Sequence, residues 1–185
     1  MTTKQAKKLA KEKLSPRRYA HTKNVAAAAR LLAQHYGVDA DKAELAGWLH
    51  DIVKEYDHDA LLQLLGMDAI MAKSAGTQPE AVWHGPAGAI YARHCLGITD
   101  AGVLEAIACH TTGRVGMTTL DKVLYLADVI SPERDYAGVD KVRALAQTNL
   151  DAAVVATMEE NVAWLEKTGK PLAAVTLDAL AALKK

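Results

Sequence analysis

The stretch from Leu120 to Ile130, LDKVLYLADVI, decides the fold class. Its apolar residues recur at spacings of three and four, which is the period of an amphipathic α-helix. Asp128 follows Leu120 and Leu124 at intervals of four, so its carboxylate falls on the inward, apolar face of that helix. An unpaired buried carboxylate is energetically costly. We therefore expect a cation beside Asp128, either a metal ion or a basic side chain.

The same helical period runs through the rest of the chain, and no stretch alternates as a strand does. Ser15-Pro16 supplies a helix start, and Gly37 and Gly113 supply stops. Helices are expected at residues 16–36, 39–54, 57–65, 86–96, 100–110 and 118–130, and two or three more are expected over 139–167 and from 171 to the end. The predicted fold is a single all-α domain over residues 1–185, with a core at about 17–139 and C-terminal helices 140–185 packing on it.

Length and charge narrow the class of protein. A chain of 185 residues fits one domain with one active site. Basic and acidic residues number 22 each, so no overall field favours nucleic acid or an anionic membrane as a partner. The sequence shows neither a signal peptide nor a membrane span, and Cys95 and Cys109 fit no disulfide framework. We expect a soluble, cytoplasmic protein.

Two further polar sites fall on inward helix faces. His21 shares its stripe with Val25 and Leu32, and the pair His50-Asp51 lies near the end of its helix, where both side chains can reach one cavity. Taken alone, a histidine on such a stripe is more often a hydrogen-bonded core residue than a ligand. A His-Asp pair, taken alone, more often lies on the protein surface and has no catalytic role.

His84 and His110 stand at helix ends, from which an imidazole ring can enter a cleft, whereas His35, His58 and His94 have the placement of surface residues. The candidate metal ligands are His21, His50, Asp51, His84, His110 and Asp128. Nitrogen and oxygen donors without cysteine favour a catalytic site for two divalent ions (iron, manganese, cobalt or zinc) over a closed structural zinc site. On spacing alone, a separate structural role for each of these six residues is as good an interpretation as a common metal site.

Five stretches resemble the HD-domain phosphohydrolases and, within them, the bacterial YqeK-type symmetrical diadenosine tetraphosphate hydrolases. They are RYAHTKNV (18–25), LAGWLHDIVK (45–54), HGPAGA (84–89), HTTG (110–113) and LDKVLYLADVISPERDYAGV (120–139). Ser131 departs from the family pattern, because relatives commonly have an acidic residue before this proline. That departure bears on substrate detail rather than on the metal centre. The region after Val139 resembles the family only weakly.

The resemblance implies a single HD-domain helical bundle that binds two divalent ions, commonly iron. It carries the six candidate ligands over as metal ligands, with Asp51 as the bridge. One ion is then held by His21, His50 and Asp128, and the other by His84 and His110.

The resemblance also implies hydrolysis of diadenosine tetraphosphate, or another dinucleoside polyphosphate, to two ADP by a hydroxide bridging the ions. The expected catalytic residues are Asp51, Lys54 and Arg134, and the expected substrate contacts are Lys54, Arg134, Arg18 and Thr111. Lys54 and Arg134 can grip phosphate, although a solvated lysine and a surface ion pair are the plainer alternatives. Asp121 is a candidate support for a ligand. Trp83 is a candidate base-stacking residue, with a core position the stronger alternative.

Two other functions compete with this hydrolase. An HD-type nucleotidase or deoxynucleotide phosphohydrolase would use the same metal set with a different pocket. A non-catalytic nucleotide-binding regulator would bind nucleotide without turnover, but could dispense with the ligands. A small nucleotide is the expected partner in each case, and a homodimer is plausible for a chain of this size.

Overall fold

The structure is a computed structural model that describes residues 1–185, with the side chain of Ser74 outside the described set. The elements are α1 Thr3–Lys13, α2 Pro16–His35, α3 Ala40–Leu49, α4 His58–Leu65, α5 Ala69–Gly76, a 3₁₀ turn Glu80–Val82, α6 His84–His94, α7 Ala101–Cys109, α8 Thr119–Ile130, α9 Val139–Leu145, α10 Leu150–Thr168 and α11 Ala174–Leu183. Every regular element of the described chain is helical, which confirms the predicted all-α class.

Side-chain caps explain most of the helix starts. The Ser15 hydroxyl accepts the backbone N–H of Arg18 at the start of α2, and Asp39 and Asp57 cap α3 and α4 in the same way. Gly37 and Gly113 both adopt the left-handed backbone expected of helix stops.

Several expected boundaries are wrong. The last helix begins at Ala174 rather than 171, and the helix expected at 86–96 ends at His94. The predicted helix 39–54 ends at Leu49, because residues 50–56 close tight turns, with Ile52 N–H donating to Leu49 O and Lys54 N–H to Asp51 O. The predicted helix 86–96 begins two residues earlier, at His84. Helix α1, helix α5 and the 3₁₀ turn are not among the expected helices, although the Asp68 carboxylate accepts N–H bonds at the start of α5 and could have indicated that helix.

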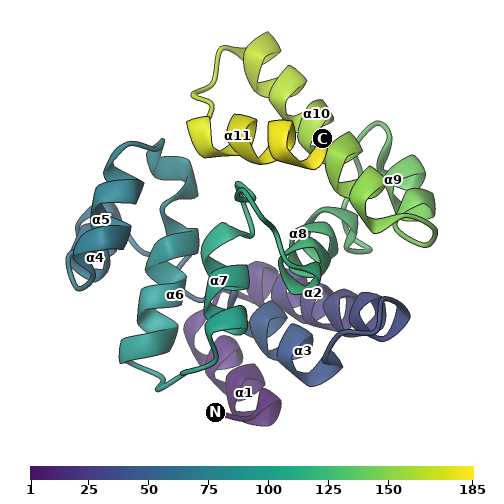
Figure 1. Cartoon of the computed structure of the whole chain (residues 1–185). Coiled ribbons are helices and arrows are strands. Elements are labelled where there is room, and N and C mark those ends of the chain that lie inside the picture. Colours follow the sequence, from purple (N-terminus) through teal and green to yellow (C-terminus); the bar gives the residue numbers. More distant parts are fainter.

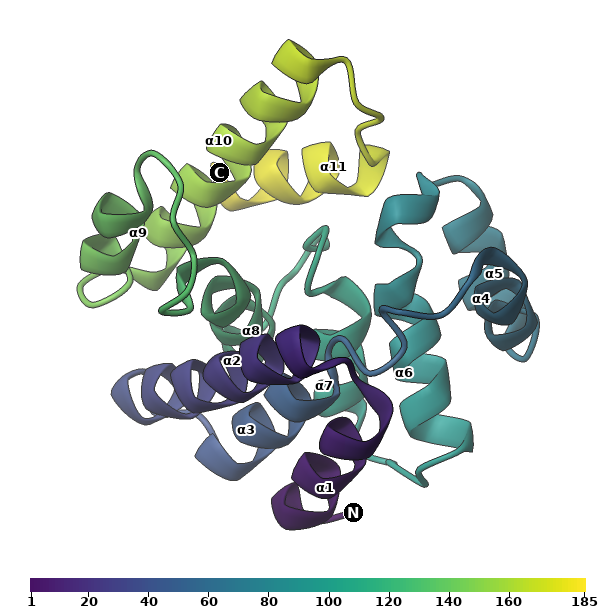
Figure 2. The ribbon, with the colours of Figure 1, turned by 180° about the vertical axis from the view of Figure 1, so that it is seen from behind.

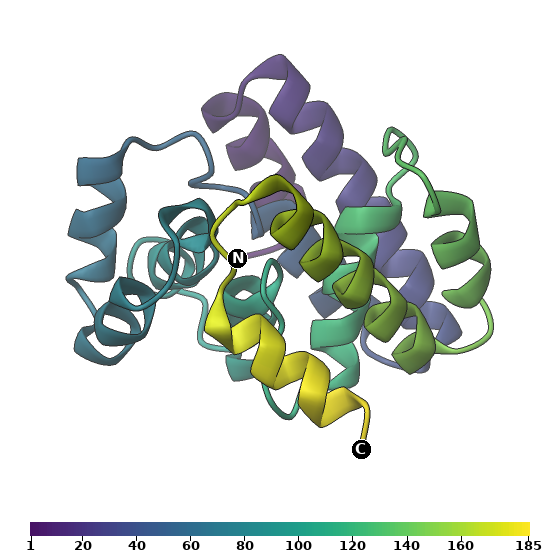
Figure 3. The same ribbon diagram turned by 90° about the horizontal axis from the view of Figure 1, so that it is seen from above.

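Helices α2, α3, α7 and α8 form the centre of the molecule (Figure 1). Helix α2 packs against α3 and α8, and α6 packs against α7, which in turn contacts α8. Helices α10 and α11 lie at one end and α1 at the opposite end, as the view from behind also shows (Figure 2). Seen from above, α10 passes over α8, with which it is in contact (Figure 3).

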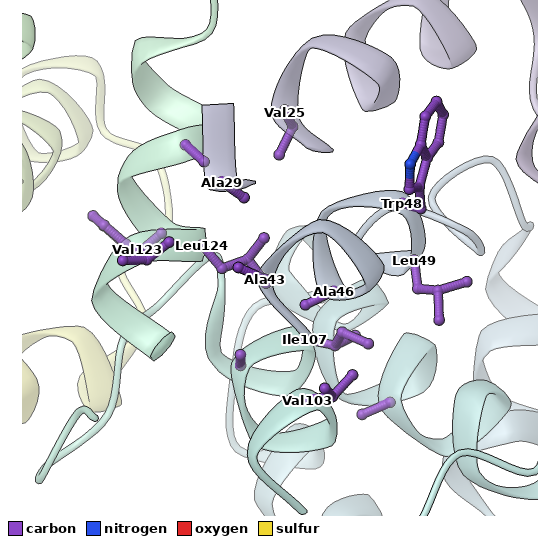
Figure 4. Packing of buried hydrophobic residues seen from close by; sticks show 14 of the residues in the cluster. Val25, Ala29, Ala43, Ala46, Trp48, Leu49, Val103, Ile107, Val123 and Leu124 are labelled. Carbon is purple, nitrogen blue, oxygen red and sulfur yellow. The ribbon is translucent and has the colours of Figure 1, made fainter. Parts of the chain in front are cut away.

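The core is built from medium-sized aliphatic side chains and alanines. Figure 4 shows Leu49 on α3, Ile107 on α7, Val25 on α2 and Leu124 on α8 among the side chains of this core. All four side chains are fully buried. Burying each such side chain contributes roughly 1.5 to 3 kcal/mol, so this cluster holds the ligand-bearing helices together.

Two glycines allow the close helix contacts on which the site depends. A Cβ at Gly47 would lie 2.6 Å from Ala26 Cα, so α3 can approach α2 this closely only without a side chain there. A Cβ at Gly85 would lie 2.7 Å from the Ala108 carbonyl oxygen, which sets the same condition between α6 and α7.

No helix of the described chain combines the length and the apolarity that a membrane crossing requires. Cys95 and Cys109 are both free, as the spacing predicted.

Candidate metal centre

The six residues expected as ligands come from five segments that meet at one point. His21 lies on α2, His50 and Asp51 follow α3, His84 begins α6, His110 follows α7, and Asp128 lies near the end of α8. All are buried except Asp128, whose side chain is 17% exposed. Within this set, three groups of three residues each place donor atoms within 4.8 Å of one another.

Asp51 occupies the middle of the cluster. Its Oδ2 lies 3.4 Å from His50 Nε2 and 3.8 Å from His21 Nε2, whereas its Oδ1 lies 3.4 Å from His84 Nε2 and 3.7 Å from His110 Nε2. Donor atoms that bind one ion at about 2.1 Å are roughly 3.0 to 3.5 Å apart. The two oxygens thus face two separate pairs of imidazoles, which is the arrangement of a carboxylate between two ions.

Hydrogen bonds that the outer ring nitrogens donate to backbone carbonyl oxygens direct two of the imidazoles inward. His50 Nδ1 lies 2.7 Å from Gly47 O, and His110 Nδ1 lies 2.8 Å from Ile107 O, so in both rings Nδ1 carries the hydrogen. Their Nε2 atoms are buried and have no hydrogen-bond partner among the described residues. A buried ring nitrogen that is aimed at a carboxylate and has no hydrogen-bond partner fits a place for a bound cation.

The charges in the site influence one another. Burial opposes ionisation of Asp51, but His50 and His110 outweigh it and hold the pKa of this carboxyl well below its usual value. Asp128 shows the same balance, because His21, His50 and Arg134 overcome burial and lower its pKa. Both residues are therefore carboxylates at neutral pH.

Burial, reinforced by His110 and Lys54, holds the pKa of His84 well below its usual value. This imidazole is neutral at pH 7 and can offer a lone pair to a cation. Burial also lowers the pKa of Lys54.

Three basic side chains surround the carboxylates. Arg18 Nη1 donates to Asp51 Oδ2 over 2.7 Å, and Arg134 donates both to the side chain of Asp128 and to its carbonyl oxygen. Lys54 Nζ lies 3.1 Å from His84 Nδ1. The structure thus brings Arg18, Lys54 and Arg134 to the candidate ligands, and the ion pair of Arg134 is with the candidate ligand Asp128.

Thr111 and Asp121, two other residues predicted for the site, have different surroundings. The Thr111 hydroxyl, next to His110, is buried and has no partner among the described residues. Asp121 is fully buried away from the ligands, where it accepts the Thr118 N–H at the start of α8 and pairs with Arg114. Its role is to cap α8.

Trp83 packs against the core, and its Nε1 donates to the carbonyl oxygens of Ala75 and Gln78. It lines a pocket of about 190 Å³ together with Cys109 and Thr112. None of the six candidate ligands lines this pocket.

Sequence reasoning missed Glu133. Its Oε1 lies 2.5 Å from His21 Nδ1, its Oε2 accepts from Asn24 Nδ2, and the Ser131 hydroxyl donates to Oε1. These contacts hold the pKa of Glu133 at about 2, against the opposing effect of burial. The spacing of Asn24, three residues after His21 on one helix face, was a signal that a polar partner lies there.

Comparisons with known proteins agree with this geometry. The family model described as "HD domain" matches residues 18–133. The chain is 37% identical over 172 residues to "Bis(5'-nucleosyl)-tetraphosphatase, symmetrical" of Bacillus subtilis (strain 168), covering 93% of this chain and 92% of that protein. It is 39% identical to the protein of the same name from Staphylococcus aureus (strain NCTC 8325 / PS 47), covering 97% and 93%.

A solved structure has the same architecture. It is described as a predicted HD superfamily hydrolase involved in NAD metabolism from Clostridium acetobutylicum, with a TM-score of 0.86 and 29% identity, and the match covers 100% of this chain and 97% of that one. The family match, the similar relatives and the buried His/Asp cluster all indicate a metal-binding hydrolase. The chain therefore belongs to the HD domain family.

Proposed function

We propose that this protein hydrolyses dinucleoside tetraphosphates symmetrically, so that diadenosine tetraphosphate gives two molecules of ADP. The observation that carries the proposal is the position of the Asp51 carboxylate, whose two oxygens face different pairs of imidazole Nε2 atoms. A two-ion centre suits the cleavage of a phosphoanhydride bond. The substrate and the symmetry of cleavage are those in the names of the relatives above.

In this proposal His21, His50 and Asp128 would hold one ion and His84 and His110 the other, and Asp51 would serve as a ligand of both. Two such ions would lower the pKa of a water toward neutrality and neutralise phosphoryl oxygens. The nitrogen and oxygen donors are compatible with iron, manganese, cobalt or zinc, and we propose iron as the native metal.

The protein supplies positive charge for the phosphates through Arg18, Lys54 and Arg134. Arg134 can present its planar guanidinium to two phosphate oxygens at once, and Lys54 acts as a compact point charge. During hydrolysis, negative charge spreads over the equatorial and leaving oxygens, so fixed cations stabilise the transition state more than the ground state. Asp51, Lys54 and Arg134 are accordingly the proposed catalytic group, with Arg18 and the Thr111 hydroxyl as substrate contacts.

The test is a product assay on the iron- or manganese-loaded protein. Diadenosine tetraphosphate is added, the nucleotides are separated by anion exchange, and a panel of nucleoside mono- and triphosphates is run in parallel. We expect ADP as the sole product and no turnover after chelation. AMP together with ATP, or faster turnover of a mononucleotide, would contradict the proposed substrate. Light scattering on the same sample tests the predicted homodimer.

A further inference from the structure

The candidate imidazoles differ in what holds the outer nitrogen of the ring. His50 and His110 directly follow α3 and α7, and each ring contacts the carbonyl oxygen three residues earlier in its own chain. The last four carbonyl oxygens of a helix lack amide partners within that helix. A histidine at a helix end can therefore be oriented by its own backbone.

His21 cannot be oriented in this way. It lies well inside α2, which spans Pro16–His35, and inside a helix each carbonyl oxygen bonds to the amide four residues later. Its Nδ1 instead lies 2.5 Å from Glu133 Oε1, on a segment 112 residues further along the chain. On the other side of the ring, Nε2 lies 3.0 Å from Asp128 Oδ1.

We propose that Glu133 is a positioning residue, which orients His21 so that Nε2 presents its lone pair to the ion shared with Asp128. This inference rests on the proposed metal centre and adds the residue that fixes one of its ligands. A carboxylate at Nδ1 selects the tautomer with hydrogen on Nδ1, fixes the plane of the ring and makes Nε2 a stronger donor.

Glu133 is itself held firmly, although its side chain is 37% exposed. Asn24 Nδ2 donates to Oε2 over 2.6 Å, and the hydroxyl of the fully buried Ser131 donates to Oε1 over 2.8 Å. Because Asn24 lies one turn after His21 on α2, the carboxylate is tied to the same helix as the ring that it orients.

Hydrogen bonds also fix the backbone around Glu133, in the segment 131–134. Arg143, on α9, donates to the carbonyl oxygens of Ile130, Ser131 and Arg134 over 3.2, 3.0 and 2.9 Å. These three carbonyls flank Glu133 on both sides. The position of His21 thus depends on a chain of contacts that reaches from α2 through the segment 131–134 to α9.

The experiment is a Mn²⁺ titration of the full-length, metal-free chain, with bound ions counted by electron paramagnetic resonance. The variant is Glu133→Gln, which removes the charge and keeps the shape, and Glu133→Ala removes the contact. We expect two ions in the unsubstituted protein. In both variants we expect affinity for one ion to fall roughly 10- to 100-fold, with the other unchanged. Asp135→Asn, the same loss of charge two residues away, is the matched control and leaves both affinities unchanged.

Nitrogen NMR of the imidazoles gives a second readout, which does not depend on metal. We expect Nδ1 of His21 to carry a hydrogen that is hydrogen-bonded to Glu133 in the unsubstituted protein, and to lose that hydrogen in Glu133→Ala, where Asp128 is the remaining carboxylate at the ring. Failure of the unsubstituted protein to bind two ions would overturn the proposed metal centre. Two ions bound with equal affinity by that protein and by both Glu133 variants would leave the centre standing and overturn this inference alone.

Discussion

His50 and His110 contact carbonyl oxygens three residues away, whereas His21 contacts a carboxylate 112 residues away. The first two, which we term the helix-end histidines, are oriented by the backbone of their own helices. The third, the mid-helix histidine, depends on a side chain from another segment. A backbone carbonyl cannot be removed by a substitution, but a side chain can, so the two kinds of ligand differ in how easily they are disturbed.

The two kinds of histidine also differ in how exposed their surroundings are to solvent. The helix-end histidines are almost fully buried, while Glu133 and Arg134, beside the mid-helix histidine, have side chains that are 37% and 39% exposed. The side of the centre formed by α2 and α8 therefore lies nearer to solvent, and we expect phosphate groups to approach from there.

The largest effect on metal binding and turnover is expected at Asp51, whose carboxylate lies between the helix-end and the mid-helix histidines. Asp51→Asn removes the carboxylate that faces both the helix-end and the mid-helix histidines, so we expect loss of both ions. Turnover should fall at least about 1,000-fold, the equivalent of roughly 4 kcal/mol in the barrier. Elemental analysis and a product assay measure the two changes. Asp59→Asn, at an exposed position on α4, is the control, and two bound ions in Asp51→Asn would refute the bridge.

Removing one helix-end histidine tests whether the two ions are separable. In His110→Ala we expect one bound ion in place of two, and turnover reduced at least about 100-fold, because a direct ligand matters more than a residue that supports one. His21→Ala should give the same stoichiometry from the opposite side. His94→Ala, an exposed histidine on α6, serves as control. Loss of both ions in each ligand variant would show that the two sites fill together.

A smaller effect is expected from Arg143, which supports the segment around Glu133. Arg143→Met removes its bonds to three carbonyl oxygens, and we expect the free energy of unfolding to fall by about 1 to 3 kcal/mol. Affinity for one ion should fall less than in Glu133→Gln. Urea denaturation and the Mn²⁺ titration measure both, with Arg93→Met on α6 as control. Unchanged stability would indicate that the segment 131–134 holds its position without α9.

The smallest expected effect concerns Glu55, which joins the turns after Asp51 to the start of the helix that carries His21. Ser15 donates its backbone N–H and its hydroxyl to this carboxylate, and these bonds lower the pKa of Glu55. Because the folded pKa lies below the unfolded value of about 4.3, the stabilisation is present above that pH and is lost as the pH falls through the folded pKa.

Glu55→Gln should therefore destabilise the metal-free protein at pH 7 by less than about 1 kcal/mol, since the contact is exposed. The difference between variant and unsubstituted protein should shrink below about pH 4. Thermal denaturation from pH 3 to 7 measures it, and a difference that grows on acidification would reverse the assigned sign.

Local sequence patterns were enough to predict the helical class, most helix starts and the six candidate ligands. These features depend on local geometry, because the helical period places Asp128 on a buried face and a serine or an aspartate caps a helix within one turn. The sequence also placed His84 and His110 at helix ends. Its errors were local as well, since turns after Leu49 end a helix that the apolar pattern extended to residue 54.

How these residues face one another depends on contacts between distant segments, which appear only in the folded structure. The pairing of each Asp51 oxygen with its own two imidazoles requires the close approach of α2 to α3 and of α6 to α7 at Gly47 and Gly85. The assignment of Glu133 to His21 joins two segments that no helical period relates. Spacing along one helix specifies a face, but a contact between distant segments depends on how closely the helices pack, and residue order alone does not encode that distance in any local pattern.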